Sequence, residues 1–313
     1  MKTIKYKIKI KGLKTPSGTI SILALKDLAN IFIENSERAL RLAIEGNSLR
    51  KGQLPQWLKL AVDFNITSIK KGSTVLALEA PELSEVAAEQ ISQQNLWIDL
   101  PEPNDTALTI WANSFIEATT EKYGSELYDK ALLTSFISFK DFIDKYADSI
   151  EIDSAVDKKI KQLKINNQQI ERVQKLTASI PESRKIILSG FIDVIEHYAG
   201  RFKLNLESGE KIQGEIDRSI LDLELMRDYW GKKVTVRGTA DYKPNGKIRF
   251  IKADLLKPFE ESEKVFEEYM MLEEPRELVY QISKNKPEIS PLKEIWGKWP
   301  SEESIEEILS ELD

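Results

Sequence analysis

The stretch that most constrains the fold is residues 184–258, in which short alternating runs of apolar and polar residues are interrupted by turn residues. The interruptions stand at Ala199-Gly200, Ser208-Gly209, Gly231 and Pro244-Asn245-Gly246. An apolar residue at every second position predicts a strand with one buried face, and about five short strands bury that face best by closing on themselves. The segment therefore predicts a small closed or nearly closed β-barrel, OB-like or SH3-like, with a short helix inserted near 219–229.

The N-terminal stretch Lys2–Lys11 alternates in the same way, with isoleucines and Tyr6 on one face and lysines on the other. This pattern predicts a half-buried strand. We interpret the lysines as a solvated strand face that also prevents edge-to-edge pairing with another chain. A nucleic-acid contact through the same lysines is the alternative.

Helical periodicity follows between Leu23 and Gly46, where apolar residues recur at steps of three and four and the glycine supplies a C-cap. Residues 58–83 then hold two β-rich runs around a turn at 70–73, which predicts a hairpin. A further helix is expected from about 83 to 94. This order of elements favours a small sheet with a helix across one face.

Residues 101–183 are predicted to be mainly helical. Asp105 or Thr106 can cap a helix that runs to about residue 123, and apolar residues at helical spacing predict a second helix over 126–146. A strand is expected near 158–165. A third helix over 168–179 has Asn166 or Asn167 as its cap.

The fold class predicted from these elements is α+β, divided into four parts. An α+β domain occupies 1–100, a mainly helical segment 101–183, and the small β-barrel 184–258. Residues 259–313 are expected to form an acidic linker and a tail that binds a partner.

The composition excludes several classes of protein. The 313 residues include no cysteine, so disulfides, thiolate metal sites and cysteine nucleophiles are ruled out. The absence of cysteine fits a reducing cytoplasm, which is the location we expect. No run approaches about 18 uninterrupted apolar residues, and the alternating N-terminus does not resemble a secretion signal, so we expect neither a membrane span nor an export signal.

No complete catalytic motif is found, and the chain is therefore predicted to be non-enzymatic. The sequence has no phosphate-binding glycine loop, no nucleophile elbow and no zinc-protease helix. The single histidine, His197, lies beside an expected hairpin turn, so we assign it a structural or surface role. We expect no cofactor and no bound metal. A magnesium-dependent nuclease built from carboxylates alone is kept as an alternative, because Asp and Glu are abundant.

The barrel segment carries a mild excess of positive charge. Residues 184–258 contain 15 Lys/Arg against 11 Asp/Glu, a balance of +4. A basic small barrel with aromatic residues can bind single-stranded nucleic acid, which is the second functional hypothesis. The candidate aromatic residues are Phe202, Tyr242 and Phe250. The candidate basic residues are Arg201, Lys203, Arg237, Lys243, Lys247 and Arg249.

The C-terminal segment is acidic and carries conspicuous apolar residues. Residues 259–313 hold 6 Lys/Arg against 16 Asp/Glu, a balance of −10, which favours a protein partner. Ser301 is a good N-cap, and the glutamates after it suit the positive end of a helix. Isoleucine and leucine recur at helical spacing from Ile305 to Leu312 and predict one apolar stripe. A helix this short requires a surface on which to dock, either its own body or another protein. The candidate partner-binding residues are Trp296, Trp299, Pro300, Ile305, Ile308, Leu309 and Leu312.

The same segment, LKEIWGKWPSEESIEEILSELD, resembles the C-terminal tails of bacterial antitoxins that pair with PIN-domain ribonuclease toxins. The matching residues are Trp296, Gly297, Trp299, Pro300, Glu303, Ile305, Glu306, Glu307, Ile308 and Leu312. Ser301 stands where those tails usually have glycine. The resemblance is confined to residues 291–313, and a vaguer one links the barrel segment to uncharacterised bacterial proteins. The resemblance to antitoxin tails implies that residues 291–313 wrap a toxin and cover the toxin's acidic, magnesium-dependent active site.

The leading hypothesis is an antitoxin-like protein that docks its tail on a ribonuclease and neutralises it by occlusion. The nucleic-acid-binding barrel and the carboxylate-only nuclease are the alternatives. The sequence does not specify an oligomeric state.

Overall fold

The computed structural model describes residues 1–16, 19–49, 52–70, 74–92, 100–154, 160, 163–196, 200–216 and 228–261. The chain divides into two units, Met1–Glu263 and Lys264–Asp313, and every element named below belongs to the first. The tail at 291–313 and His197 lie outside the described residues, as does nearly all of the helix expected near 219–229.

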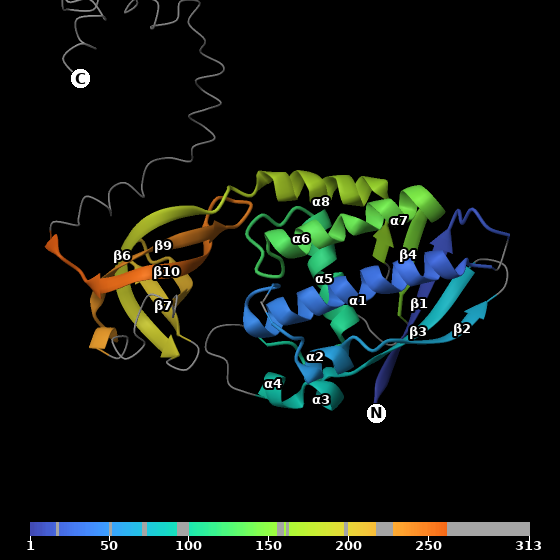
Figure 1. Cartoon of the computed structure of the whole chain (residues 1–313), viewed down its shortest axis with the longest axis horizontal. Helices are drawn as coiled ribbons and strands as arrows, with labels where there is room; N and C mark the ends of the chain where they lie inside the picture. The colour runs from blue at the N-terminus through green and yellow to red at the C-terminus, as the bar shows by residue number, and fades with distance from the viewer. Residues whose placement is uncertain are drawn as a thin grey trace, which may run out of the picture. The chain divides into compact units, whose positions relative to one another are not determined.

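A five-stranded antiparallel sheet forms the first part of this unit (Figure 1). Its strands lie in the order β2 (Asn65–Lys70), β3 (Thr74–Pro81), β1 (Thr3–Lys11), β4 (Ser149–Asp153) and β5 (Leu163–Ile165). The alternation predicted for β1 is confirmed, because its isoleucines and Tyr6 are buried while its lysines face outward. Since β4 and β5 come from the segment 101–183, that segment completes the same sheet as the N-terminal strands.

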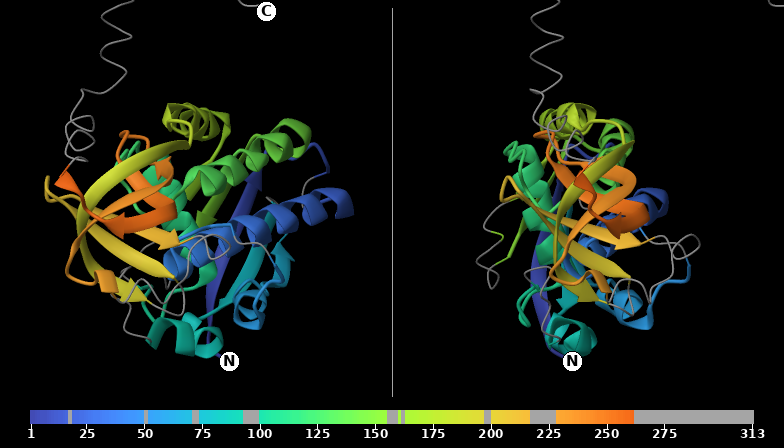
Figure 2. Two further views of the ribbon diagram at one scale, coloured as in Figure 1. Left: turned by 60° about the vertical axis from the view of Figure 1, so that its left-hand side comes forward. Right: turned by 90° about the vertical axis from the view of Figure 1, so that its left-hand side faces the viewer.

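Helices cover the apolar face of this sheet (Figures 1 and 2). The longer ones are α1 (Ile22–Glu45), α5 (Ala107–Thr119), α6 (Lys130–Phe136), α7 (Ser138–Tyr146) and α8 (Asn167–Ser179). Short helices α2 (Gln56–Ala61), α3 (Leu83–Val86) and α4 (Ala88–Ser92) lie in the connections. One aromatic-rich core fills the space between the layers, with Trp111 at its centre.

Local capping explains where the predicted helices begin and end. Gly46 ends α1 with a left-handed backbone (φ 76°), a conformation that costs a residue without Cβ little. The Thr106 side chain accepts a hydrogen bond from the Thr109 N–H at the start of α5, and Asn166 caps α8 in the same way. These three sequence predictions are confirmed.

Other element predictions are wrong in detail. Residues 58–61, expected in a hairpin strand, belong to α2, because Trp57, Leu58 and Ala61 bury one helical face. The helix expected over 126–146 is two helices. α6 begins after its N-cap Asp129, and Ile137 separates it from α7. Strand β4 was not predicted, although its isoleucines alternate and are buried.

The second part is a closed five-stranded barrel, as residues 184–258 predict (Figure 2). Its strands are β6 (Arg184–Glu196), β7 (Arg201–Leu206), β8 (Lys211–Ile216), β9 (Lys233–Tyr242) and β10 (Ile248–Pro258). They close in the order β10-β8-β7-β6-β9, with β8 and β10 parallel and the other pairs antiparallel. That Greek-key order is OB-like, whereas an SH3-like barrel is an antiparallel meander.

Candidate functional site

The six basic residues predicted to contact nucleic acid are distributed over three strands and one hairpin turn. On β9, Arg237 donates to Asp254 at 2.7 Å. On β7, Arg201 lies 3.9 Å from Glu196, and Lys203 is half-buried and makes interactions of its own. The structure therefore places these three residues beside internal partners.

The remaining three residues belong to the β9–β10 hairpin. Lys243 forms an ion pair with Glu126, between α5 and α6. Lys247 lies 3.8 Å from Glu210. Arg249, whose side chain is 11% exposed, lies 3.9 Å from Asp129 and donates to the Gly46 carbonyl at 3.3 Å. Lys243 and Arg249 thus connect the barrel to the helical layer.

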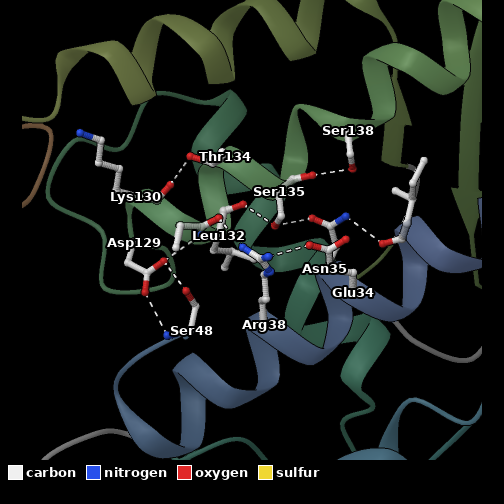
Figure 3. Close-up of polar contacts among 12 residues, drawn as sticks. Glu34, Asn35, Arg38, Ser48, Asp129, Lys130, Leu132, Thr134, Ser135 and Ser138 are labelled. Atoms are coloured by element: carbon white, nitrogen blue, oxygen red, sulfur yellow. Dashed lines mark hydrogen bonds and ion pairs between the residues drawn. The ribbon is translucent and has the colours of Figure 1, made fainter. Parts of the chain in front are cut away.

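Asp129 is the centre of this connection, and Figure 3 shows its carboxylate beside Ser48. Its carboxylate caps α6 by accepting from the Leu132 N–H at 2.8 Å, and it accepts from both the N–H and the hydroxyl of Ser48 at 3.0 and 2.6 Å. We call Gly46, Ser48, Asp129 and Arg249 the junction network. Because Ala240 and Tyr242 of the barrel also belong to the larger core, the barrel is joined to the helices by apolar packing as well as by charge.

The aromatic residues proposed for base stacking are mostly internal. Phe202 is fully buried in the barrel core. Tyr242 is 7% exposed and accepts a hydrogen bond from Arg184 at 2.9 Å. Phe250 is half-buried. Two other aromatic residues of the barrel part, Phe191 and Trp230, have 46% and 68% of their surface exposed.

Phe191 and Trp230 are close together along β6. Ile192, the residue after Phe191, bridges to Trp230, and the Trp230 indole N–H donates to the Asp193 carbonyl at 3.1 Å. Since Ile192 is buried inside the barrel, Phe191 has to face outward. The sequence analysis identified neither residue as a candidate. For Phe191 a signal was present, because Leu188 and Ile192 face the barrel core and side chains alternate along a strand, which places Phe191 on the outer face.

A row of outward residues crosses the barrel at Phe191. The strand pairings place Lys233 of β9 on one side of Phe191, and on the other side Asn205 of β7 followed by Lys211 of β8. We call Lys233, Phe191, Asn205 and Lys211 the aromatic row. Neighbouring strands are about 4.8 Å apart, so the phenyl ring has a lysine one strand away and another two strands away.

The lysines on the outer face of the sheet form ion pairs with carboxylates of the neighbouring strands. Lys9 donates to Asp153 at 2.9 Å, Lys11 lies 2.6 Å from Glu151, and Lys5 lies 3.3 Å from Glu79. The hydrogen bond with Asp153 raises the pKa of Lys9. This arrangement supports the interpretation of β1 as a strand with a solvated face whose lysines are balanced by neighbouring strands. The expected role of these lysines in preventing edge-to-edge pairing is wrong, because β1 is the central strand and pairs with both β3 and β4.

The carboxylates of the described residues do not converge in a way that suits a metal. Within that part of the chain, no group of three or more His, Cys, Asp or Glu residues is placed to hold an ion. The Asp254 carboxylate instead holds two cations of the barrel, Arg237 at 2.7 Å and Lys185 at 3.3 Å.

Asp254 should make stability depend on acid pH. The hydrogen bond from Arg237, supported by that from Lys185, lowers the pKa of Asp254 below its ordinary value. A carboxyl whose folded pKa is depressed stabilises the fold above its unfolded pKa of about 3.9, and this contribution is lost as pH falls through the folded value. We expect Asp254→Asn to narrow the difference between urea midpoints measured at pH 6 and near pH 3. An unchanged difference would contradict this role.

Comparison of the chain with protein-family models, with curated proteins and with solved structures finds no match. None of the described helices is long and apolar enough to cross a membrane. The function therefore has to be argued from the chain's own residues.

Proposed function

We propose that the protein is a non-enzymatic, antitoxin-like protein of the cytoplasm that binds a ribonuclease toxin through residues 291–313 and neutralises it. The observation that carries this proposal is the division of the chain. The folded body ends within the unit Met1–Glu263, and the whole tail belongs to the second unit, Lys264–Asp313. The residues that match antitoxin tails are thus separate in sequence from the sheet, the helices and the barrel.

The distribution of charge also supports a partner-binding role for the tail rather than for the body. In the body, Arg237, Lys243 and Arg249 are paired with carboxylates of the same unit. The segment 259–313 has a balance of −10, from 6 Lys/Arg against 16 Asp/Glu. An acidic segment with two tryptophans and an apolar stripe suits a partner that offers a hydrophobic groove with a basic rim.

Occlusion is the proposed mechanism. Trp296, Trp299 and the stripe from Ile305 to Leu312 fill the groove, while the glutamates face the rim. The tail then covers the acidic site at which the toxin would bind magnesium and RNA. Such a mechanism requires no catalytic residue in this chain. The carboxylate-only nuclease is less well supported, because the described carboxylates include no metal-binding group.

Removing the tail tests the proposal. The full chain and a variant ending at residue 290 are each co-expressed with the product of the adjacent gene, and the complex is measured by co-purification and by inhibition of RNA cleavage. We expect the full chain to bind and inhibit, and the truncated chain to do neither.

Point variants make the test specific. Trp296→Ala and Trp299→Ala should each weaken the complex by about 2 kcal/mol or more, as expected for buried tryptophan anchors. Glu311→Gln, which changes one charge on the tail's polar face, is the matched control and should change affinity little. A complex that survives deletion of 291–313 would show that the tail is not the binding element.

A further inference from the structure

We propose that the aromatic row and Trp230 form a binding surface for single-stranded nucleic acid on the outside of the barrel. This proposal does not rest on the toxin-binding tail. It also differs from the sequence-based hypothesis, because none of the residues that carry it is among the basic and aromatic candidates identified from sequence.

The two aromatic side chains provide stacking surfaces. Phe191 and Trp230 are the most exposed aromatic residues of the described barrel part, and they lie beside the same stretch of β6. The hydrogen bond to the Asp193 carbonyl fixes the Trp230 indole before any ligand arrives. An aromatic ring held in place loses little conformational entropy when a base stacks on it.

The lysines around the aromatic side chains suit phosphate. Lys211 ends the aromatic row, and Lys232 is an exposed residue two positions after Trp230. Lys211 has Asp193 as its carboxylate partner at 3.8 Å, with side chains 66% and 47% exposed. Exposed pairs of this kind are worth about 0–1 kcal/mol, so a phosphate can replace the carboxylate at little cost.

The exposure of the charged side chains distinguishes this surface from the junction network. Arg249 and Asp129 are both 11% exposed, and Lys243 is 15% exposed, so these side chains are largely withdrawn from solvent. Lys233 is similar, since it is 19% exposed and pairs with Glu207 at 2.7 Å, so we assign the phosphate contacts to Lys211 and Lys232. By contrast, Phe191, Trp230, Lys211 and Lys232 are all exposed residues. Aromatic surfaces beside cations favour a nucleic-acid strand, whose bases can stack and whose phosphates can pair with lysine, over an apolar peptide, which offers the lysines no charged group.

Fluorescence anisotropy with the full-length protein tests the proposal, using labelled oligothymidine and oligouridine of about 12 nucleotides, within the usual site size. We expect binding at low salt. Phe191→Ala and Trp230→Ala should each weaken binding by about 5- to 150-fold, the usual cost of losing one stacking partner. Phe191 is 46% exposed and Trp230 is 68% exposed, so urea midpoints should remain close to that of the wild-type protein.

Two further variants identify the cause. Tyr123→Ala removes a 44% exposed aromatic residue outside the barrel and should leave binding unchanged. Combining Lys211→Gln with Lys232→Gln should reduce the slope of log K against log salt by about 1.4, or 0.7 for each lost phosphate contact. Absence of binding by the wild-type protein at low salt would overturn the proposal and leave the surface to a protein partner. Equal binding by the Trp230→Ala and Tyr123→Ala proteins would also overturn it.

Discussion

Replacing Asp129 by alanine is expected to destabilise the folded body by about 3–5 kcal/mol, the usual cost of removing one member of a buried ion pair. The carboxylate accepts from the Leu132 N–H and from both donors of Ser48, and it lies 3.9 Å from Arg249. The variant loses the α6 cap and leaves Arg249 without its carboxylate partner in a site where that side chain is 11% exposed.

Equilibrium urea unfolding of the full-length protein measures this effect. Glu126→Ala is the control, because Glu126 also pairs with a barrel lysine but its side chain is 70% exposed. We expect the control to cost at most about 1 kcal/mol. A double-mutant cycle between Asp129→Ala and Arg249→Ala should give a coupling energy of about 0.5–3 kcal/mol. A loss at Asp129 no larger than that at Glu126 would show that the junction network does not stabilise the fold.

The sequence predicts well those elements whose causes are local. The Gly46, Thr106 and Asn166 caps lie within one turn of the backbone groups that they satisfy, so the local amino-acid sequence is enough to identify them. The barrel is predictable for a related reason, since period-2 alternation and turn residues are both short-range signals. The choice between an OB-like and an SH3-like barrel depends on which distant strands pair. The sequence does not reveal that pairing, so it predicts the barrel without deciding between the two types.

The candidate surfaces depend more strongly on non-local contacts. Gly46 and Arg249 are 203 positions apart in the chain, and nothing in either neighbourhood indicates that they meet. Counting lysines and arginines therefore identified residues that the fold pairs internally. Phe191 is different, because the phase of the alternation in β6 places it outside, and its direction could have been inferred from Leu188 and Ile192.

Trp111→Ala should cause the other large loss of stability, about 3–5 kcal/mol. The indole is fully buried in the core between the sheet and the helices. Its ring centroid lies 5.4 Å from that of Phe32, 5.6 Å from that of Phe139 and 6.0 Å from that of Phe115. Truncation removes these contacts and leaves a cavity that close-packed neighbours from three helices fill only in part.

Trp111→Phe tests ring packing alone. The indole Nε1 is buried and has no hydrogen-bond partner among the described residues, so a phenyl ring loses volume but no polar contact. We therefore expect a smaller loss for phenylalanine than for alanine. Tyr123→Ala, which truncates an aromatic ring that is 44% exposed, should stay within about 0.5 kcal/mol of wild type. Urea unfolding checks all three variants. If alanine at 111 cost no more than phenylalanine, Trp111 would not be the central packing element of this core.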